Sequence, residues 1–254
     1  MKQTQHEYGK YVIGSWNING FYSVRNPYYL TFKLSVIKHL YFDILVMPEH
    51  HCINDQVLKI DNYEVYQYNR KSLANLNHGS GGIAIAVHKT LLNTHTMVGK
   101  YEGIDGQLGI KLRNVENEFV LGILGLYLSP DSFHYGQDAE SFFNHCAVLC
   151  DDLGDCDLLV GAGDVNARTK QLLDFIPDID GNLIPERLNP DKIKNSHGDA
   201  FLSFLKNTRN IILNGRITPQ FNNFTFVTSR GCSVPDYLFT PIEHIQFCQE
   251  VRTL

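Results

Sequence analysis

The sequence DLLVGAGDVNAR at residues 157–168 decides the fold of this chain more than any other stretch. Its apolar run at 158–160 leads into the small residues at 161–163, and this pattern predicts a buried strand. Side chains alternate along a strand, so Asp164 and Asn166 point the same way from its carboxyl end. A neighbouring carboxylate and amide suit a hydroxylic nucleophile or a hard metal ion with oxygen ligands. An Asx turn that closes the strand is the alternative for this D-x-N sequence.

Other apolar runs also end in polar groups. These runs are YVIGSW (11–16) before Asn17, DILVM (43–47) before Glu49, and SVPDYLFT (233–240), which contains Asp236. A carboxylate at the end of a buried strand is costly unless it reaches water, a metal or a cation. Sites in open α/β sheets gather where the carboxyl ends of several strands converge. We therefore expect one cluster formed by Asn17, Glu49, Asp164, Asn166 and Asp236.

These residues belong to an ordered set of short motifs. In chain order the set comprises SWNING (15–20), Glu49 after a strand, SGGIAIAV (80–87), YLSP (127–130), GDVNA (163–167), FTF (224–226) and SVPDY (233–237). This set resembles the endonuclease/exonuclease/phosphatase superfamily, which includes apurinic endonucleases, pancreatic deoxyribonuclease and inositol polyphosphate 5-phosphatases. Three further stretches are similar to the endonuclease domain of non-LTR retrotransposons, namely YGQDAESFF (135–143), NSHG (195–198) and ILNGR (212–216). The resemblance covers about residues 11–245.

The resemblance implies a site for phosphodiester hydrolysis that uses Mg²⁺ or Mn²⁺. It assigns Glu49 to the metal ion as its principal ligand, assisted by Asn17. It assigns Asp164 to the attacking water, as the group that orients or deprotonates it. The amide of Asn166 is expected to hold the scissile phosphate.

Two more residues receive roles from the resemblance. It places the phenol of Tyr127 near the phosphate, whereas a half-buried core tyrosine is the alternative without it. It implies that Asp236 orients a histidine that hydrogen-bonds the phosphate. In the family that histidine lies in an S-D-H motif, and the residues after Asp236 contain none. His244 matches a position that has no catalytic role in the retrotransposon branch, and Pro235, which cannot donate to a strand ladder, is a second departure.

The expected domain organisation follows from the same comparison. Residues 1–10 are expected to form an N-terminal tail, followed by one domain at 11–254 that is truncated and lacks its last strand and the S-D-H motif. The 254 residues are 43% hydrophobic and 19% charged, which is the composition of an ordinary globular domain. No apolar run is long enough to span a bilayer, and residues 1–10 lack the apolar core of a signal peptide. The six cysteines have neither zinc nor disulfide spacing, which favours an intracellular setting, and a nuclear one suits a DNA substrate.

The net charge of −5 argues against a passive nucleic-acid-binding module, because such modules have a basic excess. It is compatible with a nuclease whose metal ion offsets its carboxylates and whose basic residues cluster locally. Arg70 and Arg230 are the candidate substrate-binding residues, with Lys71, Lys192 and Lys194 as further members of a basic patch. Scattered solvated charges are the alternative.

The apolar periodicity predicts the secondary structure. Helices are expected at 30–41, 139–153 and 199–206. Strands are expected at 11–17, 43–47, 64–69, 82–88, 108–113, 118–127, 157–163, 210–214, 224–228 and 236–240. Many strands with few helices predict an α/β protein with two packed sheets flanked by helices. The resemblance implies a four-layer α/β sandwich with two mixed β-sheets.

The sequence thus predicts a metal-dependent DNA endonuclease domain of retrotransposon type, impaired without its histidine. Its partners are then a DNA substrate and, in a longer polypeptide, a downstream reverse transcriptase domain. A non-catalytic remnant of the fold and a phosphatase of small phosphorylated molecules are the alternatives. A zinc site at His50 and His51 is not expected, because adjacent residues on a strand face opposite ways.

Overall fold

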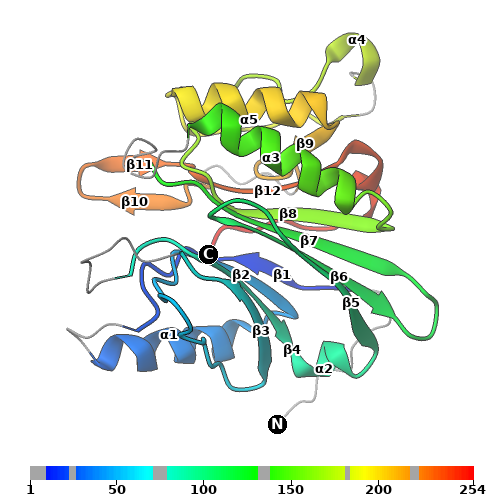
Figure 1. The fold of residues 1–254 in the computed structure, drawn as a ribbon. Coiled ribbons are helices and arrows are strands. Elements are labelled where there is room, and N and C mark those ends of the chain that lie inside the picture. Colours follow the sequence, from blue (N-terminus) through cyan, green and yellow to red (C-terminus); the bar gives the residue numbers. More distant parts are fainter. Residues whose placement is uncertain (1–9, 23–26, 71–78, 131–137, 181–183, 218–222) are drawn as a thin grey trace.

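The computed structural model describes residues 10–22, 27–70, 79–130, 138–180, 184–217 and 223–254. Within these residues two β-sheets pack face to face between helices (Figure 1). The first sheet has the strand order β1 (Ile13–Ser15), β2 (Ile44–Pro48), β4 (Ile83–His88) and β3 (Tyr63–Tyr68). The second has the order β5 (His95–Glu102), β6 (Gln107–Asn114), β7 (Val120–Tyr127), β8 (Leu158–Asp164), β12 (Asp236–Pro241) and β9 (Asn210–Ile212).

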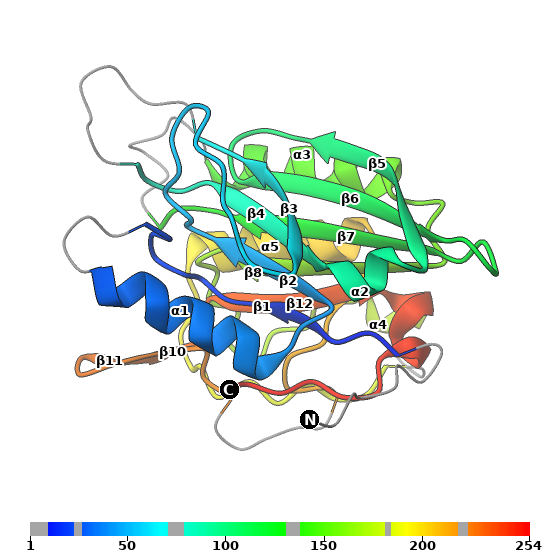
Figure 2. The same cartoon turned by 90° about the horizontal axis from the view of Figure 1, so that it is seen from below.

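The remaining elements lie around these sheets. The strands β10 (Phe226–Thr228) and β11 (Gly231–Ser233) form a separate ribbon. The helices are α1 (Pro27–Leu40), α2 (Lys89–Leu92), α3 (Ala139–Asp152), α4 (Pro177–Asp180), α5 (Ser196–Asn207) and the 3-10 helix η2 (Ile242–Phe247). Helix α1 covers the outer face of the first sheet, and α3 and α5 cover that of the second (Figures 1 and 2).

Three apolar layers hold the sandwich together. The central layer lies between the sheets and includes Val46, Ile85, Ile110, Ile123 and Val160, each buried. A second layer joins α3 and α5 to the six-stranded sheet, and a third joins α1 to the four-stranded sheet. Both sheets are mixed, because β1 pairs with β2 and β7 with β8 in parallel while their other pairs are antiparallel. The predicted four-layer α/β sandwich is confirmed.

Every predicted strand and helix is present, with ends that differ by a few residues. The strands β5 and β11 and the short helices α2, α4 and η2 were not predicted from the sequence. Strand β5 is an edge strand with one exposed face, and its register shifts between Met97 and Gly99, so its alternation is weak in the sequence. Strand β11 lies in an exposed ribbon and lacks an apolar pattern. No helix in the described part of the chain is both long and apolar enough to cross a membrane.

Proline at position 235 lies one residue before β12, so the strand ladder needs no N–H from it. Its carbonyl accepts a hydrogen bond from the backbone N–H of Val165 at 3.2 Å. Strand β12 then pairs with β8 from its first residue, and Asp236 lies opposite Asp164. The proline therefore does not interrupt the pairing that brings these two carboxyl groups together.

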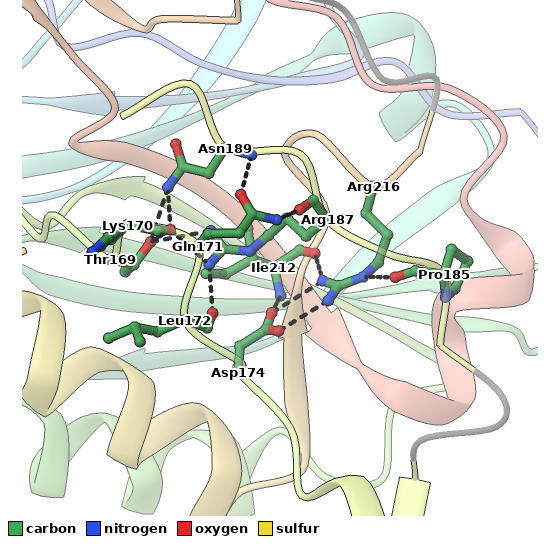
Figure 3. Close-up of polar contacts among 10 residues, drawn as sticks. All are labelled: Thr169, Lys170, Gln171, Leu172, Asp174, Pro185, Arg187, Asn189, Ile212 and Arg216. Atoms are coloured by element: carbon green, nitrogen blue, oxygen red, sulfur yellow. Dashed lines mark hydrogen bonds and ion pairs between the residues drawn. The ribbon is translucent and has the colours of Figure 1, made fainter. Parts of the chain in front are cut away.

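A buried polar network fixes the polypeptide that leaves β8 (Figure 3). Arg216 donates two hydrogen bonds to Asp174, at 3.0 and 2.9 Å, and both side chains are 1% exposed. Asp174 also accepts from the N–H of Ile212 in β9 at 2.7 Å. Nearby, Arg187 donates to the Thr169 hydroxyl at 3.0 Å and to the Leu172 carbonyl at 2.8 Å. These contacts hold the segment after β8 against β9.

Candidate active site

The predicted cluster lies at one edge of the sandwich, where strands of both sheets end. Asn17 and Glu49 follow β1 and β2 of the four-stranded sheet. Tyr127 and Asp164 are the last residues of β7 and β8, and Asp236 is the first of β12. The register places Tyr127 beside Asp164 and Asp164 beside Asp236. The topology therefore assembles this group from five distant parts of the chain.

Asn17 connects the two sheets at this edge. Its amide nitrogen donates to Glu49 Oε1 at 3.2 Å and to Asp164 Oδ2 at 2.7 Å. Its amide oxygen accepts from the N–H of Asn19 at 3.0 Å, so the nitrogen faces the two carboxyl groups. In this arrangement Asn17 positions one carboxyl group from each sheet.

Glu49 is an ionised carboxylate in this environment. Burial raises its pKa, but hydrogen bonds from His51, Tyr127 and Asn17 outweigh this effect and lower the pKa below its ordinary value. Its backbone φ is +56°, a left-handed conformation that costs about 1–3 kcal/mol for such a residue and is typical of functional sites. Within the described ranges no three His, Cys, Asp or Glu side chains converge as a closed metal cage. One carboxylate with neighbouring polar groups fits Mg²⁺, which keeps several waters.

Asp164 and Asp236 form a carboxyl pair in which Asp164 is buried and Asp236 is half-buried. Burial and the neighbouring Asp236 raise the pKa of Asp164 well above its ordinary value, against the hydrogen bonds from Asn17 and the Asn166 N–H. Burial raises the pKa of Asp236 to about 6, and a hydrogen bond with Thr225 opposes the shift. A carboxyl group with a raised pKa is suited to accept a proton near neutral pH.

The NSHG motif positions the loop that contains Asn166. Asn195 caps helix α5 by accepting from the Gly198 N–H at 2.8 Å, and it also accepts from the Arg168 N–H at 2.8 Å. Its amide nitrogen donates to the Asn166 carbonyl at 2.9 Å. Asn166 has a φ of +49° and donates its side-chain amide to the Leu128 carbonyl at 2.9 Å. The motif therefore places Asn166 beside the end of β7.

Gly163 allows β7 and β8 to approach each other directly before Asp164. Its φ is +151°, and a Cβ at this position would lie 1.8 Å from the Leu126 carbonyl oxygen. Only glycine fits this conformation and this contact. The close contact between β7 and β8 thus explains why a glycine precedes the aspartate in the GDVNA motif.

Arg70, a predicted substrate-binding residue, lies beside Tyr127 at the strand ends. Its guanidinium carbon lies 5.8 Å from the centre of the Tyr127 ring, and the side chain forms an ion pair with Asp105. Tyr127 is buried, and burial followed by repulsion from Glu49 raises the pKa of its phenol, so Tyr127 acts as a donor to Glu49.

The other predicted basic residues are not brought to this site. Arg230 is exposed in the turn between β10 and β11, Lys192 is an exposed loop residue, and Lys194 pairs with Asp199 at 3.0 Å. Lys71 lies outside the described residues, as do residues 1–9 of the predicted tail and 135–137 of the YGQDAESFF motif. Among the described residues of the predicted basic patch, Arg70 is therefore the one that lies at the strand ends.

The sequence analysis also missed His51, whose ring Nε2 lies 3.2 Å from Glu49 Oε2. His50 points the other way, as expected for its neighbour: it is fully buried and bonds to the Cys52 N–H and the Tyr68 carbonyl. The contact between His51 and Glu49 could have been predicted from their spacing, since His51 stands two residues after Glu49.

His244 lies at the opposite end of β8, where its Nδ1 accepts from the Leu159 N–H at 3.1 Å.

Comparison with known proteins supports the fold. No protein-family model and no curated protein sequence matches the chain. Among solved structures, the 3'-5' exonuclease NExo from Neisseria meningitidis is 14% identical with a TM-score of 0.63, covering 94% of this chain and 90% of that chain. The AP endonuclease LMAP from Leishmania major is 13% identical with a TM-score of 0.66, covering 91% and 79%. An endonuclease/exonuclease/phosphatase family protein from Leptotrichia buccalis is 10% identical with a TM-score of 0.60, covering 91% and 87%.

The chain shares the two-sheet α/β sandwich fold of these solved structures. In this fold the strand ends that carry Asn17, Glu49, Asp164 and Asp236 meet at the junction of the two sheets. The identities are low, so the similarity establishes the architecture, and the chemistry has to be argued from the residues of this chain.

A direct test of the metal site is Glu49→Gln, which removes one charge at nearly constant volume. We expect weak Mg²⁺ binding by the wild-type chain and an affinity at least about tenfold lower in the variant, as is typical when a metal site loses a supporting group. Titration calorimetry measures both, and Glu116→Gln at an exposed position is the matched control. Unchanged affinity in Glu49→Gln would remove Glu49 from the metal site.

The carboxyl pair predicts a pH dependence of stability. The pKa of Asp236 is about 6 in the folded chain and about 4 when unfolded, so the folded state binds this proton more tightly. Its stabilising contribution is therefore largest in acid and is lost as the pH rises from about 4 through 6. Urea unfolding in EDTA should show the wild type losing stability relative to Asp236→Asn over this range. A constant difference between the two proteins would contradict the assigned shift.

Proposed function

We propose that this chain is a Mg²⁺-dependent phosphodiester hydrolase that acts on DNA. The observation that supports this most strongly is the contact of one amide, that of Asn17, with an ionised Glu49 and with Asp164, whose pKa is raised. The two groups provide a metal ligand and a proton acceptor within one site. Among proteins of the same fold, NExo has been determined with a product DNA hairpin.

Each residue then has a defined role. Glu49, with Asn17 beside it, would hold Mg²⁺ or Mn²⁺, and this metal would supply charge stabilisation for the phosphoryl oxygens. Asp164 orients the attacking water and accepts its proton, and Asp236 keeps the pKa of Asp164 high. Asn166 donates its amide to the phosphate, and Tyr127 places its phenol near it. Arg70 contacts the DNA backbone at the strand ends, and Arg230 contacts it farther out, from the β10–β11 turn.

We further propose that the chain is an endonuclease domain of retrotransposon type, with a reverse transcriptase domain as its partner and a nuclear location. The motifs at 195–198 and 212–216 support this assignment. We also propose that the chain cleaves slowly, because no histidine of the described segments bonds to Asp236. Reading the coding DNA beyond Leu254 tests the retrotransposon assignment. A reverse transcriptase and an S-D-H segment there would support it, whereas the absence of an S-D-H segment would favour the non-catalytic remnant.

Cleavage of supercoiled plasmid tests the function. We expect slow nicking that requires Mg²⁺ or Mn²⁺ and stops in EDTA, because the phosphoryl charge is stabilised through Glu49. Salt-sensitive DNA binding without any nicking would instead identify a non-catalytic remnant. Release of phosphate from inositol polyphosphates, with the plasmid left intact, would identify a small-molecule phosphatase.

A further inference from the structure

Helix α1 and Tyr22, which lies in the described segment preceding it in the chain, expose several aromatic side chains. We define the α1 aromatic face as Tyr22, Tyr28, Tyr29 and Phe32. Tyr28 is 81% exposed, Phe32 60%, Tyr29 51% and Tyr22 44%. The chain buries the aromatic residues of its other long helices, such as Phe142, Phe143, Phe201 and Phe204. Packing of the domain therefore does not account for this face.

A series of contacts connects the α1 aromatic face to the candidate site. The Tyr29 ring lies with its centre 4.7 Å from the ammonium of Lys33, a residue that is only 2% exposed. Lys33 donates to the Ile18 carbonyl at 2.6 Å and to the Gly20 carbonyl. The Gly20 N–H in turn donates to the Glu49 carbonyl at 2.6 Å. Residues 18–20 are thus fixed both to helix α1 and to Glu49.

The charge of α1 suits a polyanion. Its sequence PYYLTFKLSVIKHL has two lysines, one histidine and no carboxylate. In contrast, α3 contains Glu140, Asp151 and Asp152, and α5 contains Asp199, as expected for a chain with net charge −5. A nucleic acid therefore meets no carboxylate repulsion from α1 itself.

The position of α1 suits a substrate that passes over the strand ends. In both views the first turn of α1 and the β10–β11 ribbon project beyond the end of the sheets toward which β1 points (Figures 1 and 2). Asn17 follows β1 at this end. The helix and the ribbon therefore flank the candidate site on two sides.

We propose that the α1 aromatic face stacks unpaired bases of the DNA substrate, so that the preferred substrate has a single-stranded segment next to the cleaved phosphodiester. This inference rests on the proposed function and names its substrate class. Flat aromatic rings stack on any base, whatever its identity.

Binding to two labelled DNAs without metal tests the proposal. One is a blunt duplex and the other has a single-stranded overhang with 2-aminopurine. The wild type should bind the overhang DNA more tightly and quench the 2-aminopurine. Tyr28→Leu and Phe32→Leu keep an apolar side chain but remove the ring, so each should weaken overhang binding at least about fivefold. Tyr28→Phe should retain the preference, and Phe247→Leu, at an exposed ring of η2, is the control.

The outcomes separate this inference from the proposed function. If the leucine variants bind the overhang and quench 2-aminopurine as the wild type does, the stacking surface is refuted even when plasmid nicking is observed. If the wild type forms a dimer that Phe32→Leu dissociates, the face binds a second copy and the proposal is wrong. An overhang preference that depends on the rings, in a chain that nicks nothing, would refute only the hydrolase function.

Discussion

Exchanging Asp164 for asparagine is expected to lower the rate of plasmid nicking about 10²–10⁴-fold, the usual contribution of one general acid–base group. The exchange removes the proton acceptor but nearly preserves the volume of the side chain. Asn17, which donates to Asp164 at 2.7 Å, still finds an amide oxygen in the variant. The loss should therefore appear in the chemical step, with little change in DNA affinity.

Two comparisons make this result decisive. Asp199→Asn changes an exposed carboxylate that pairs with Lys194, and its nicking rate should equal that of the wild type. Thermal unfolding should show that Asp164→Asn is folded, since burial already raises the pKa of Asp164 and favours an uncharged group there. A folded Asp164→Asn protein that nicks at the wild-type rate would refute the catalytic assignment.

The largest effect on stability is expected at Arg216. Replacing it by methionine leaves the Asp174 carboxylate buried without its cation, and such a loss costs about 3–5 kcal/mol. The Asp174 carboxylate then retains the N–H of Ile212 as a donor, which is insufficient for a buried charge. This is a large share of the free energy of unfolding of an ordinary domain, about 5–15 kcal/mol.

Urea unfolding at neutral pH measures this loss. Arg113→Met is the matched control, because it breaks an ion pair with Glu118 in which both side chains are exposed, 49% and 74%. The control should lose no more than about 1 kcal/mol. Equal losses in Arg113→Met and Arg216→Met would show that the network around Asp174 is not a main anchor of this segment.

The sequence predicts the parts of this fold that depend on continuous apolar runs. Strands β2 and β8 are apolar throughout, so their burial and their polar ends follow from the pattern around Glu49 and Asp164. The edge strand β5 could not be found in this way, because only one of its faces is buried. The helices α1 and α3 were found from their apolar stripes, but nothing in that pattern predicted that Phe32 would stay exposed.

The sequence predicted which residues converge at the candidate site, but not how their side chains contact one another. The order of the motifs indicated that Asn17, Glu49 and Asp164 converge. The orientation of the Asn17 amide, the bond between His51 and Glu49 and the pairing of Arg70 with Asp105 depend on side-chain geometry between segments that are distant in the chain. No local pattern encodes such contacts.

The bridge formed by Asn17 has a consequence for when the protein can act. Glu49 belongs to one sheet and Asp164 to the other, so neither sheet holds the metal ligand and the proton acceptor together. A chain in which one sheet has formed and the other has not has only half of the reaction machinery. Under the proposed function, cleavage of DNA therefore requires the two sheets to be docked, and a partly unfolded chain would leave the nucleic acid around it intact.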